Sequence, residues 1–548
     1  MRVAWLLLVL TAVGALLLVA IGAALFGNAT QDWLFGITGE TEPLPQLRGF
    51  FQYLSNYTRP APQTDEFAAV AHAGVNPLGV NTFLQLEVEP SKREKQMQMV
   101  RDAGFGWIRQ EFTWEDIEIH GKGDFQDRRN DPARSAWEKY DHIVDLAEKY
   151  DVEIIARLSN PPAWTRALTD TVGTRAPPDD FADYGDFVAE VAQRYKGRIH
   201  YYQLWNEPNI YPEWGEQPVD PLAYTNLLCE GYRRAKAVDP EIAILSGALA
   251  QTIDLSGRDL NDFIFLQRMY DAGAADCFDI LTTNAYLLWS APTDHRMRPF
   301  VTNFGRTEYI RDIMVRNGDA HKPIWISEMN SNAIPAASDG QDIIGWGAYG
   351  QVSQATQAAW APLAYQRAQA EWPYVGVVNF WFFKPASDAD ANQAYYYFRM
   401  VEPDFSTLPV YESIKTYAQE QPRMYPGTHQ EDHWAITWTG EWSEQAGATA
   451  TLGASRLAIQ DAQARVCIEG SRLQIVPAPD SDPDARYTLE KDAGNCYTLS
   501  ADPGFAVDGF LVSRSSQPRA LGVLVFVGAV ALGWMGRRIW KTRQRFAL

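Results

Sequence analysis

Short apolar runs and longer amphipathic stretches alternate along the chain between residues 78 and 420. Eight runs are nearly continuously apolar and have the length of buried strands: 78–84, 106–112, 152–158, 199–205, 242–248, 279–286, 323–329 and 375–383. Amphipathic segments with helical spacing separate and follow them: 91–103, 136–150, 181–196, 221–238, 259–273, 305–317, 348–371 and 409–420. Two of these segments open with "DPARSAWEKY" and "DPLAYTNLL", which place Asp, Pro and Ser where the first N–H groups of a helix need acceptors. Eight strand–helix units predict an α/β fold, a parallel (β/α)8 TIM barrel; a doubly wound open sheet is the alternative.

The pattern changes on both sides of the predicted barrel. After residue 425, short alternating stretches such as "HWAITWTGEW", "ARVCIEG" and "NCYTLSA" are separated by Gly, Asp and Pro, which predicts a small antiparallel β domain. This domain is a candidate sugar-binding module, or otherwise a spacer or lid. Residues 31–77 are rich in Pro, Gly, Asn and Thr without a firm period, and we expect a stalk that packs partly on the barrel.

Both ends of the chain carry apolar segments. Residues 3–26 are uncharged, and as a helix they would reach about 36 Å, enough to cross a hydrocarbon core of roughly 30 Å. We predict an uncleaved anchor here; a signal peptide cleaved near "GNA" (27–29) is the alternative. A second apolar run, 521–536, precedes a basic tail. The positive-inside rule then predicts a cell-membrane protein with cytoplasmic termini and an extracytoplasmic catalytic domain.

Composition agrees with this organisation. A chain of 548 residues with 46% hydrophobic residues can bury a large core, and a net charge of −20 argues against a nucleic-acid partner. The predicted division is a membrane anchor or signal-anchor (1–30), a stalk (31–77), the barrel (78–424), a small β domain (425–516), a C-terminal transmembrane helix (519–540) and a basic cytoplasmic tail (541–548).

The four cysteines fit an extracytoplasmic location without requiring one. Cys467 and Cys496 share one small region, and we expect them to pair. Cys229 and Cys277 fall in a helix-like segment and a segment before a strand, and we expect buried thiols there. No CxxC, HxH or HExxH pattern occurs, so the sequence predicts neither a metal nor another cofactor.

Two glutamates mark the place where chemistry is expected. In a parallel barrel the active site lies at the carboxyl ends of the strands. Glu207 in "YYQLWNEPN" ends the fourth predicted strand, and Glu328 in "PIWISEMN" ends the seventh. Pro208 would end the ladder beside Glu207, and Asn206 would present its amide there. Two carboxylates on one pocket suit retaining glycoside hydrolysis, which needs them roughly 5 to 5.5 Å apart with one protonated and the other ionised.

Two further strand ends offer groups that could separate the properties of these carboxylates. Arg109, in "WIRQEF" on the second strand, is a candidate cation, and Tyr286, which ends the sixth, is a candidate hydrogen-bond donor. The alternatives are an ordinary ion pair of Arg109 with Glu111 or Asp116, and a core aromatic role for Tyr286.

The motifs at these strand ends resemble a known group of enzymes. "WNEPN" on the fourth strand together with "WISEMN" on the seventh resembles clan A, the retaining glycoside hydrolases with (β/α)8 barrels. Within that clan, "LGVNTFLQLEVEPSKREKQMQMVRDAGFGWIRQEFTWEDIE" (78–118) is most similar to family 39 and to related glycosidases of bacterial exopolysaccharide clusters. The resemblance covers the predicted barrel, and families 5, 30 and 42 share its motifs.

The resemblance implies roles for individual residues. Glu207 corresponds to the acid/base and Glu328 to the nucleophile, while Asn206 would hold the sugar 2-hydroxyl. Arg109 and Tyr286 would keep the nucleophile charged and oriented. Aromatic side chains after strand ends are candidates for sugar contacts: Trp381, as the floor of the reactive subsite, and Trp114, Trp164 and Trp289, which are alternatively hydrophobic anchors of their loops. The third strand ends in "RLSNPPAWT" without the histidine-containing signature of several clan families, so no substrate contact is carried over there.

The sequence thus predicts a membrane-anchored retaining glycosidase that binds carbohydrate and cleaves a β-linked cell-surface or extracellular polysaccharide. The alternative is a catalytically inactive barrel that binds glycan or organises a membrane complex. Because both carboxylates are present together with Asn206 and Arg109, the enzyme is favoured. Transglycosylation would use the same residues and stays open.

Overall fold

The computed structural model describes residues 28–129, 131–336, 342–447 and 450–514. The expected membrane segments at 3–26 and 519–540 and the basic tail at 541–548 lie outside the described residues. Among the helices that are described, none combines the length and the apolar character needed to cross a bilayer.

Eight parallel strands form a barrel: β1 (Leu78–Thr82), β2 (Trp107–Thr113), β5 (Glu153–Ser159), β6 (Tyr201–Leu204), β7 (Ala243–Leu245), β8 (Leu281–Asn284), β9 (Ile324–Met329) and β10 (Val375–Phe380). They pair in the order β7-β6-β5-β2-β1-β10-β9-β8. Parallel bridges Leu245↔Ile280 and Leu249↔Thr283 join β7 to β8 and close the ring. All eight predicted strands are present, and closure confirms the barrel against the open sheet.

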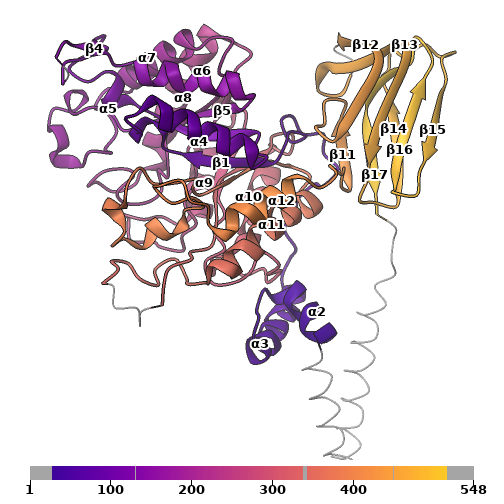
Figure 1. Ribbon diagram of the computed structural model, residues 1–548, viewed down its shortest axis with the longest axis horizontal. Coiled ribbons are helices and arrows are strands. Elements are labelled where there is room, and N and C mark those ends of the chain that lie inside the picture. The colour runs from indigo at the N-terminus through magenta and orange to yellow at the C-terminus, as the bar shows by residue number, and fades with distance from the viewer. Residues whose placement is uncertain (1–27, 130, 337–341, 448–449, 515–548) are drawn as a thin grey trace, which may run out of the picture.

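Helices on the outside of the barrel follow the predicted segments (Figure 1): α4 (Pro90–Asp102), α6 (Glu138–Tyr150), α7 (Phe181–Arg194), α8 (Pro221–Val238), α9 (Asp262–Asp271), α10 (Thr307–Arg316), α11 (Gln354–Glu371) and α12 (Pro409–Ala418). Asp220 caps α8 by accepting from the N–H groups of Leu222 and Ala223, as "DPLAYTNLL" predicts. The start of α6 differs, because its first turn follows Trp137 and has no side-chain cap.

The interior of the barrel has an apolar layer and a polar layer. Trp107, Tyr201 and Trp325 lie near the amino ends of their strands, with ring centroids 5.0 to 5.1 Å apart. Further along, the fully buried amide of Gln203 donates to the hydroxyls of Thr282 at 2.8 Å and Ser327 at 3.0 Å. Hydrogen bonds therefore satisfy polar groups in this layer, which lies towards the carboxyl ends where the glutamates were expected.

A separate antiparallel domain follows the barrel: β11 (Gly427–Gln430), β12 (Ile436–Ala446), β13 (Ala454–Cys467), β14 (Arg472–Pro477), β15 (Tyr487–Lys491), β16 (Cys496–Ala501) and β17 (Ala506–Ser513). The prediction of a small antiparallel β domain is confirmed. This domain contacts the segment that precedes β1: the N–H of Trp434 donates to the carbonyl of Gly74 at 2.7 Å.

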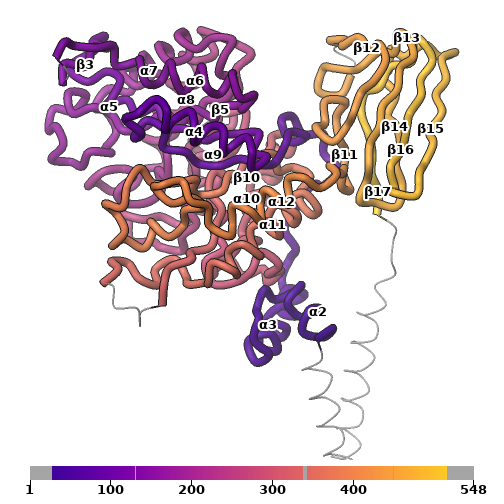
Figure 2. Tube along the Cα trace, viewed as in Figure 1, coloured from indigo at the N-terminus to yellow at the C-terminus, as the bar shows by residue number. Residues whose placement is uncertain are grey.

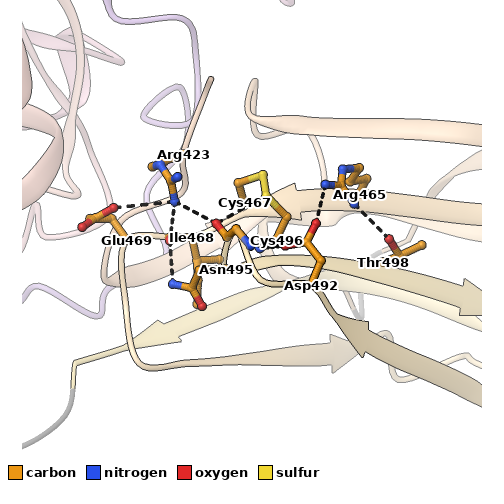
Figure 3. Close-up of a disulfide and its surroundings, with 10 residues drawn as sticks. Arg423, Arg465, Cys467, Ile468, Glu469, Asp492, Asn495, Cys496 and Thr498 are labelled. Atoms are coloured by element: carbon orange, nitrogen blue, oxygen red, sulfur yellow. Dashed lines mark hydrogen bonds and ion pairs between the residues drawn. A yellow bond between two sulfur atoms is a disulfide. The ribbon is translucent and has the colours of Figure 1, made fainter. Parts of the chain in front are cut away.

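The disulfides confirm one expectation and correct another. Cys467 and Cys496 are directly paired on β13 and β16 and are bonded, with Cα atoms 3.8 Å apart (Figure 3). This is closer than the usual lower limit of about 4.4 Å. Cys229 and Cys277, expected as buried thiols, form a second disulfide with a Cα distance of 4.8 Å. The expectation was wrong because α8 packs against the short 3-10 helix η5 (Ala274–Cys277), which brings the two residues together across 48 positions of sequence.

The segment expected to be an irregular stalk contains two helices, α2 (Asn28–Thr38) and α3 (Pro43–Leu54). Figures 1 and 2 show them as a small lobe below the barrel. The loop between β8 and α10 holds this lobe: the N–H of Ala291 donates to the carbonyl of Gly39 at 3.0 Å, and the N–H of His295 donates to that of Ile37 at 2.9 Å. Contacts with the loop after β8 therefore stabilise these two short helices, whose sequence shows no firm helical period.

Candidate active site

Backbone geometry carries Glu207 to the mouth of the barrel. The sequence predicts that Pro208 ends the fourth strand, but β6 already ends at Leu204. Trp205 follows in the left-handed region, with φ of 81°. Its buried ring contacts Trp214, with centroids 5.4 Å apart, and its indole N–H donates to the carbonyl of Glu213 at 2.9 Å. The turn at Trp205 is thus fixed by packing, and it directs the chain out of the sheet just before Glu207.

Three side chains hold the buried carboxylate of Glu328, which lies within β9. Arg109 on β2 donates from Nη1 to Oε1 at 3.0 Å. The hydroxyl of Tyr286 donates to Oε2 at 2.6 Å, and Asn284 Nδ2, at the end of β8, donates to the same oxygen at 3.3 Å. Donors from two strands and one loop therefore fix the position of this carboxylate.

The guanidinium of Arg109 is held in turn by amide side chains. Its Nε donates to Gln203 Oε1 at 2.6 Å, Nη1 to Asn81 Oδ1 at 2.8 Å, and Nη2 to Asn206 Oδ1 at 2.7 Å. Burial lowers the pKa of Arg109 to about 10, so it remains a cation at neutral pH. The guanidinium group of Arg109 thereby contacts both Asn206 and Glu328.

The two carboxylates considered as alternative partners of Arg109, Glu111 and Asp116, pair with other arginines. Arg157 pairs with Glu111 at 2.6 Å, and Arg129 pairs with Asp116 at 2.7 Å. Asn160, at the end of the third barrel strand, also donates to Glu111, at 3.0 Å. The segment without the histidine-containing signature therefore contacts a structural carboxylate in this structure.

Glu207 is in a different environment from Glu328. It lies at the mouth of the barrel, partly exposed, and Asn284 Nδ2 donates to its Oε1 at 2.6 Å. Burial of the carboxyl group raises its pKa well above the usual value, and the negative charges of Glu328 and Glu213 raise it further. A carboxyl group of this kind is suited to hold a proton near neutral pH.

One amide nitrogen, Nδ2 of Asn284, reaches both glutamates. Two oxygens that contact a common atom can be no further apart than the sum of the two contacts, which are 2.6 Å and 3.3 Å. That limit, which applies to the nearest oxygen of each carboxylate, is compatible with the roughly 5 to 5.5 Å separation of the carboxyl groups in retaining glycosidases.

Tyr286 meets the expectation of a donor. Burial and the neighbouring charge of Glu328 raise the pKa of its hydroxyl well above the usual value, so the proton stays on the oxygen. Its ring lies 5.4 Å from that of Phe398. The side chain is packed like a core aromatic while its hydroxyl points at Glu328.

The four tryptophans fall into different surroundings. Trp381, directly after β10, is partly exposed and stands edge-on to Phe83, with centroids 5.3 Å apart. Trp164 is partly exposed and donates to the carbonyl of Glu118 at 2.8 Å. Both keep accessible surface.

Trp114 and Trp289 do not meet the expectation of lining sugar subsites beside the glutamates. Trp114 is fully buried and stacked on Phe187 of α7, with centroids 5.0 Å apart, because it opens the short helix α5 (Trp114–Ile117) that directly follows β2. It is a core anchor. Trp289 is 63% exposed and lines a different cavity, bounded by α3.

Three residues of the site were missed by the sequence analysis: Asn81, Gln203 and Asn284. Each is the only amide in its strand segment, in "LGVNT", "YYQLW" and "LTTN". That isolation is the signal that could have found them, because a buried amide within a strand needs a polar partner inside the barrel. Asn284 also has a buried Oδ1 with no hydrogen-bond partner in the described part of the chain. No group of three His, Cys, Asp or Glu residues suited to a metal occurs among the described residues.

Comparison with known proteins gives matches to solved structures only. No protein-family model and no curated protein matches the chain. A family 39 glycoside hydrolase from Bacteroides cellulosilyticus WH2 is similar at 18% identity, over 81% of this chain and 82% of that one, with a TM-score of 0.48. A GH39 β-xylosidase from Caulobacter crescentus matches at 14% identity, over 83% and 97%, with a TM-score of 0.46. A GH30 endoxylanase from Clostridium papyrosolvens C71 matches at 12%, over 82% and 99%, with a TM-score of 0.42.

These matches fall in the group of glycoside hydrolases whose motifs the chain resembles. Because the identities and TM-scores are low, we base the function on the side chains of the site.

Proposed function

We propose that this protein is a membrane-anchored retaining glycoside hydrolase that cleaves β-linked glycosidic bonds in a cell-surface or extracellular polysaccharide. The observation that carries the proposal is the pair Glu207 and Glu328, which share the donor Asn284 and differ in their other hydrogen bonds and in charge environment. Glu328 is fixed by three donors, whereas Glu207 has a raised pKa and one donor.

In the proposed first step, Glu328 attacks the anomeric carbon while Glu207 gives its proton to the leaving glycosidic oxygen. The carbon–oxygen bond to the leaving sugar breaks as the bond to Glu328 forms. In the second step, Glu207, now a carboxylate, takes a proton from water, and the water oxygen displaces Glu328. Two inversions at one carbon retain the configuration. Another sugar hydroxyl in place of water would give transglycosylation.

Arg109 and Tyr286 support this mechanism by holding Glu328 as the bond forms. Asn206 shares the guanidinium of Arg109 and is the proposed contact of the sugar 2-hydroxyl. Trp381 is the proposed apolar surface for the reactive sugar ring, since it is partly exposed at the end of β10.

A panel of aryl β-glycosides and β-linked polysaccharides, incubated with the full chain in detergent, tests the activity. Product analysis by NMR would give sugar, linkage and anomeric configuration. A first-formed product with retained configuration supports the proposal, and an inverted product contradicts it. If Glu328→Ala has the same activity as the wild type on every substrate cleaved, these glutamates are not the catalytic residues, and the alternative of a catalytically inactive barrel is favoured.

The membrane part of the proposal rests on the sequence at 3–26 and 521–536 and on the basic residues beside these segments. We propose that the catalytic domain is extracytoplasmic. Protease protection on intact cells tests this: cleavage of the barrel by external protease is expected, and a protected barrel would contradict the proposed topology.

A further inference from the structure

One face of α3 presents apolar side chains to solvent. Leu44, Arg48 and Phe51 are spaced i, i+4, i+7, so they lie on one side of the helix, with Leu47 beside them. Leu44 is 76% exposed and Phe51 is 64% exposed. These four residues, called the α3 outer face, border a shallow groove of about 640 Å³. Nothing in the described chain covers these large apolar groups.

A second cavity, of about 630 Å³, adjoins this face. It lies between α3 and the loop after β8, and Arg48, Gln52, Trp289 and Arg298 are among its lining residues. Arg298 donates from Nη1 to Gln52 Oε1 at 3.2 Å, while its Nε is buried without a partner. The cavity thus combines an exposed tryptophan with arginine N–H groups, one of which has no acceptor in the described structure.

The arginines around this cavity are unequally compensated. Arg296 is bound to Asp294 at 2.7 Å and Glu40 at 2.8 Å. Arg298 is 3.7 Å from Asp294, and burial together with the positive charges of Arg296 and Arg48 lowers its pKa. An anion between Arg48 and Arg298 would reduce this repulsion.

The course of the chain identifies what lies opposite this face. The uncharged residues 3–26 end two positions before Asn28, the first residue of α2. The described chain ends just after β17, at the lower end of the β domain in Figure 1, and the α2–α3 lobe lies lower still, below the barrel. The second apolar run begins at residue 521, a few positions further on. The lobe is therefore the described part of the protein that directly follows the first segment proposed to enter the membrane, and the β domain is the part that precedes the second.

We propose that the α3 outer face rests on the bilayer surface, with Leu44 and Phe51 at the boundary of headgroups and acyl chains and with the adjoining cavity holding the headgroup of an anionic phospholipid. This inference rests on the membrane anchoring proposed above. Apolar and aromatic side chains with interspersed arginines are the composition of interfacial helices, and the arginine cavity matches the charge of a phosphate headgroup. The contact would also fix the loop after β8, which begins beside Tyr286, at the membrane.

Site-specific fluorescence of the full chain in lipid nanodiscs tests the contact. The native cysteines are all in disulfides, so an introduced cysteine is the only thiol to label. Leu44→Cys and Phe51→Cys would carry a small fluorophore, in discs of phosphatidylcholine and phosphatidylglycerol with nitroxide near the top of the acyl chains. The matched control is Leu222→Cys, an apolar residue 56% exposed at the start of α8, and Figure 1 shows this helix on the opposite side of the barrel from the lobe.

The expected result is strong quenching at positions 44 and 51 and quenching at the solution level at 222. Equal quenching at 51 and 222, in protein that co-elutes with the discs, would overturn the α3 contact and leave the anchoring intact. A full chain that does not co-elute with nanodiscs would overturn the anchoring and this inference together.

A second arm tests the headgroup. Nitroxide-labelled phosphatidylglycerol is expected to quench position 44 more than equally labelled phosphatidylcholine. Arg48→Glu should remove that excess, whereas Arg233→Glu, an exposed arginine on α8, should keep it. Equal quenching by the two lipids in the wild-type protein would overturn the anionic-headgroup site.

Discussion

Glu207 and Glu328 share one hydrogen-bond donor, Asn284, yet the protein supports them in opposite ways. Glu328 accepts from Arg109, Tyr286 and Asn284, and Arg109 is itself held by further amides. Among the described residues, Glu207 accepts a side-chain hydrogen bond only from Asn284, and burial and the charge of Glu328 raise its pKa. The same residue type is thus prepared for two tasks by the number of donors around it.

Asn284 donates to both carboxylates, but its two hydrogen bonds differ in length. Its Nδ2 is 2.6 Å from Glu207 and 3.3 Å from Glu328. Because Glu328 has two other donors, loss of Asn284 should affect Glu207 more. The comparison therefore predicts an order of effects for substitutions around the two glutamates, from Glu328, the proposed nucleophile, to the shared amide.

The largest effect is expected for Glu328→Ala. Without a carboxylate to form the glycosyl–enzyme bond, turnover should fall by several orders of magnitude on every substrate, activated or not. Azide added to this variant would attack the sugar directly and give the α-glycosyl azide from a β-glycoside. Product stereochemistry by NMR checks the assignment; a β product here would mean that the roles of the two glutamates are reversed.

Glu207→Ala should lose less, by about 10²- to 10⁴-fold on substrates with poor leaving groups, which is the usual contribution of a general acid. An aryl glycoside with an activated leaving group should still glycosylate Glu328, after which hydrolysis stalls for want of a base. A burst of released phenol followed by a slow phase is the expected time course.

Azide sharpens the same comparison, because it is an anion that needs no base. It should restore turnover of Glu207→Ala and give a β-glycosyl azide, the opposite configuration from that of Glu328→Ala. If azide does not accelerate turnover, and no glycosyl–enzyme is trapped and detected by mass spectrometry, Glu207 is not the acid/base.

The sequence predicted the barrel and both glutamates for a physical reason. Eight buried parallel strands require near-continuous apolar runs, and a carboxylate at the end of such a run is costly to bury unless it serves a site at the barrel mouth. Contacts between distant segments leave no comparable signal. The Cys229–Cys277 disulfide, the burial of Trp114 against Phe187 and the bridging position of Asn284 all depend on tertiary packing.

The α2–α3 lobe was missed for a related reason. Its helices are short, and α3 exposes apolar residues where an isolated soluble helix would be polar. Their position is set by hydrogen bonds to the loop after β8, far along the chain. Local periodicity was therefore a poor guide there.

Arg109→Met should have the next largest effect. Glu328 would lose its cation and three amides would lose a donor, so we expect about 3 to 5 kcal/mol less free energy of unfolding and a kcat lower by about 10²-fold through misplacement of the nucleophile. Denaturant unfolding and steady-state kinetics measure the two effects.

Arg157→Met is the matched control, because Arg157 is a buried arginine on the neighbouring strand β5 that pairs with Glu111. It should cost similar stability and much less kcat. Equal losses of kcat in the two variants would show that Arg109 acts through stability alone.

Asn284→Ala is expected to have the smallest effect and to change the pH dependence. The hydrogen bond from Asn284 lowers the pKa of Glu207, against the larger raising effects of burial and charge. Its loss should therefore raise that pKa further. An acid with a higher pKa keeps its proton to higher pH, so the alkaline limb of kcat/KM should move to higher pH while the maximum falls by about tenfold.

Asn379→Ala is the control. It removes a buried amide of β10 that donates to the carbonyl of Ile326, and it should leave the alkaline limb in place. A limb that moves to lower pH in Asn284→Ala, or that persists unchanged in Glu207→Gln, would show that Glu207 is not the group titrating.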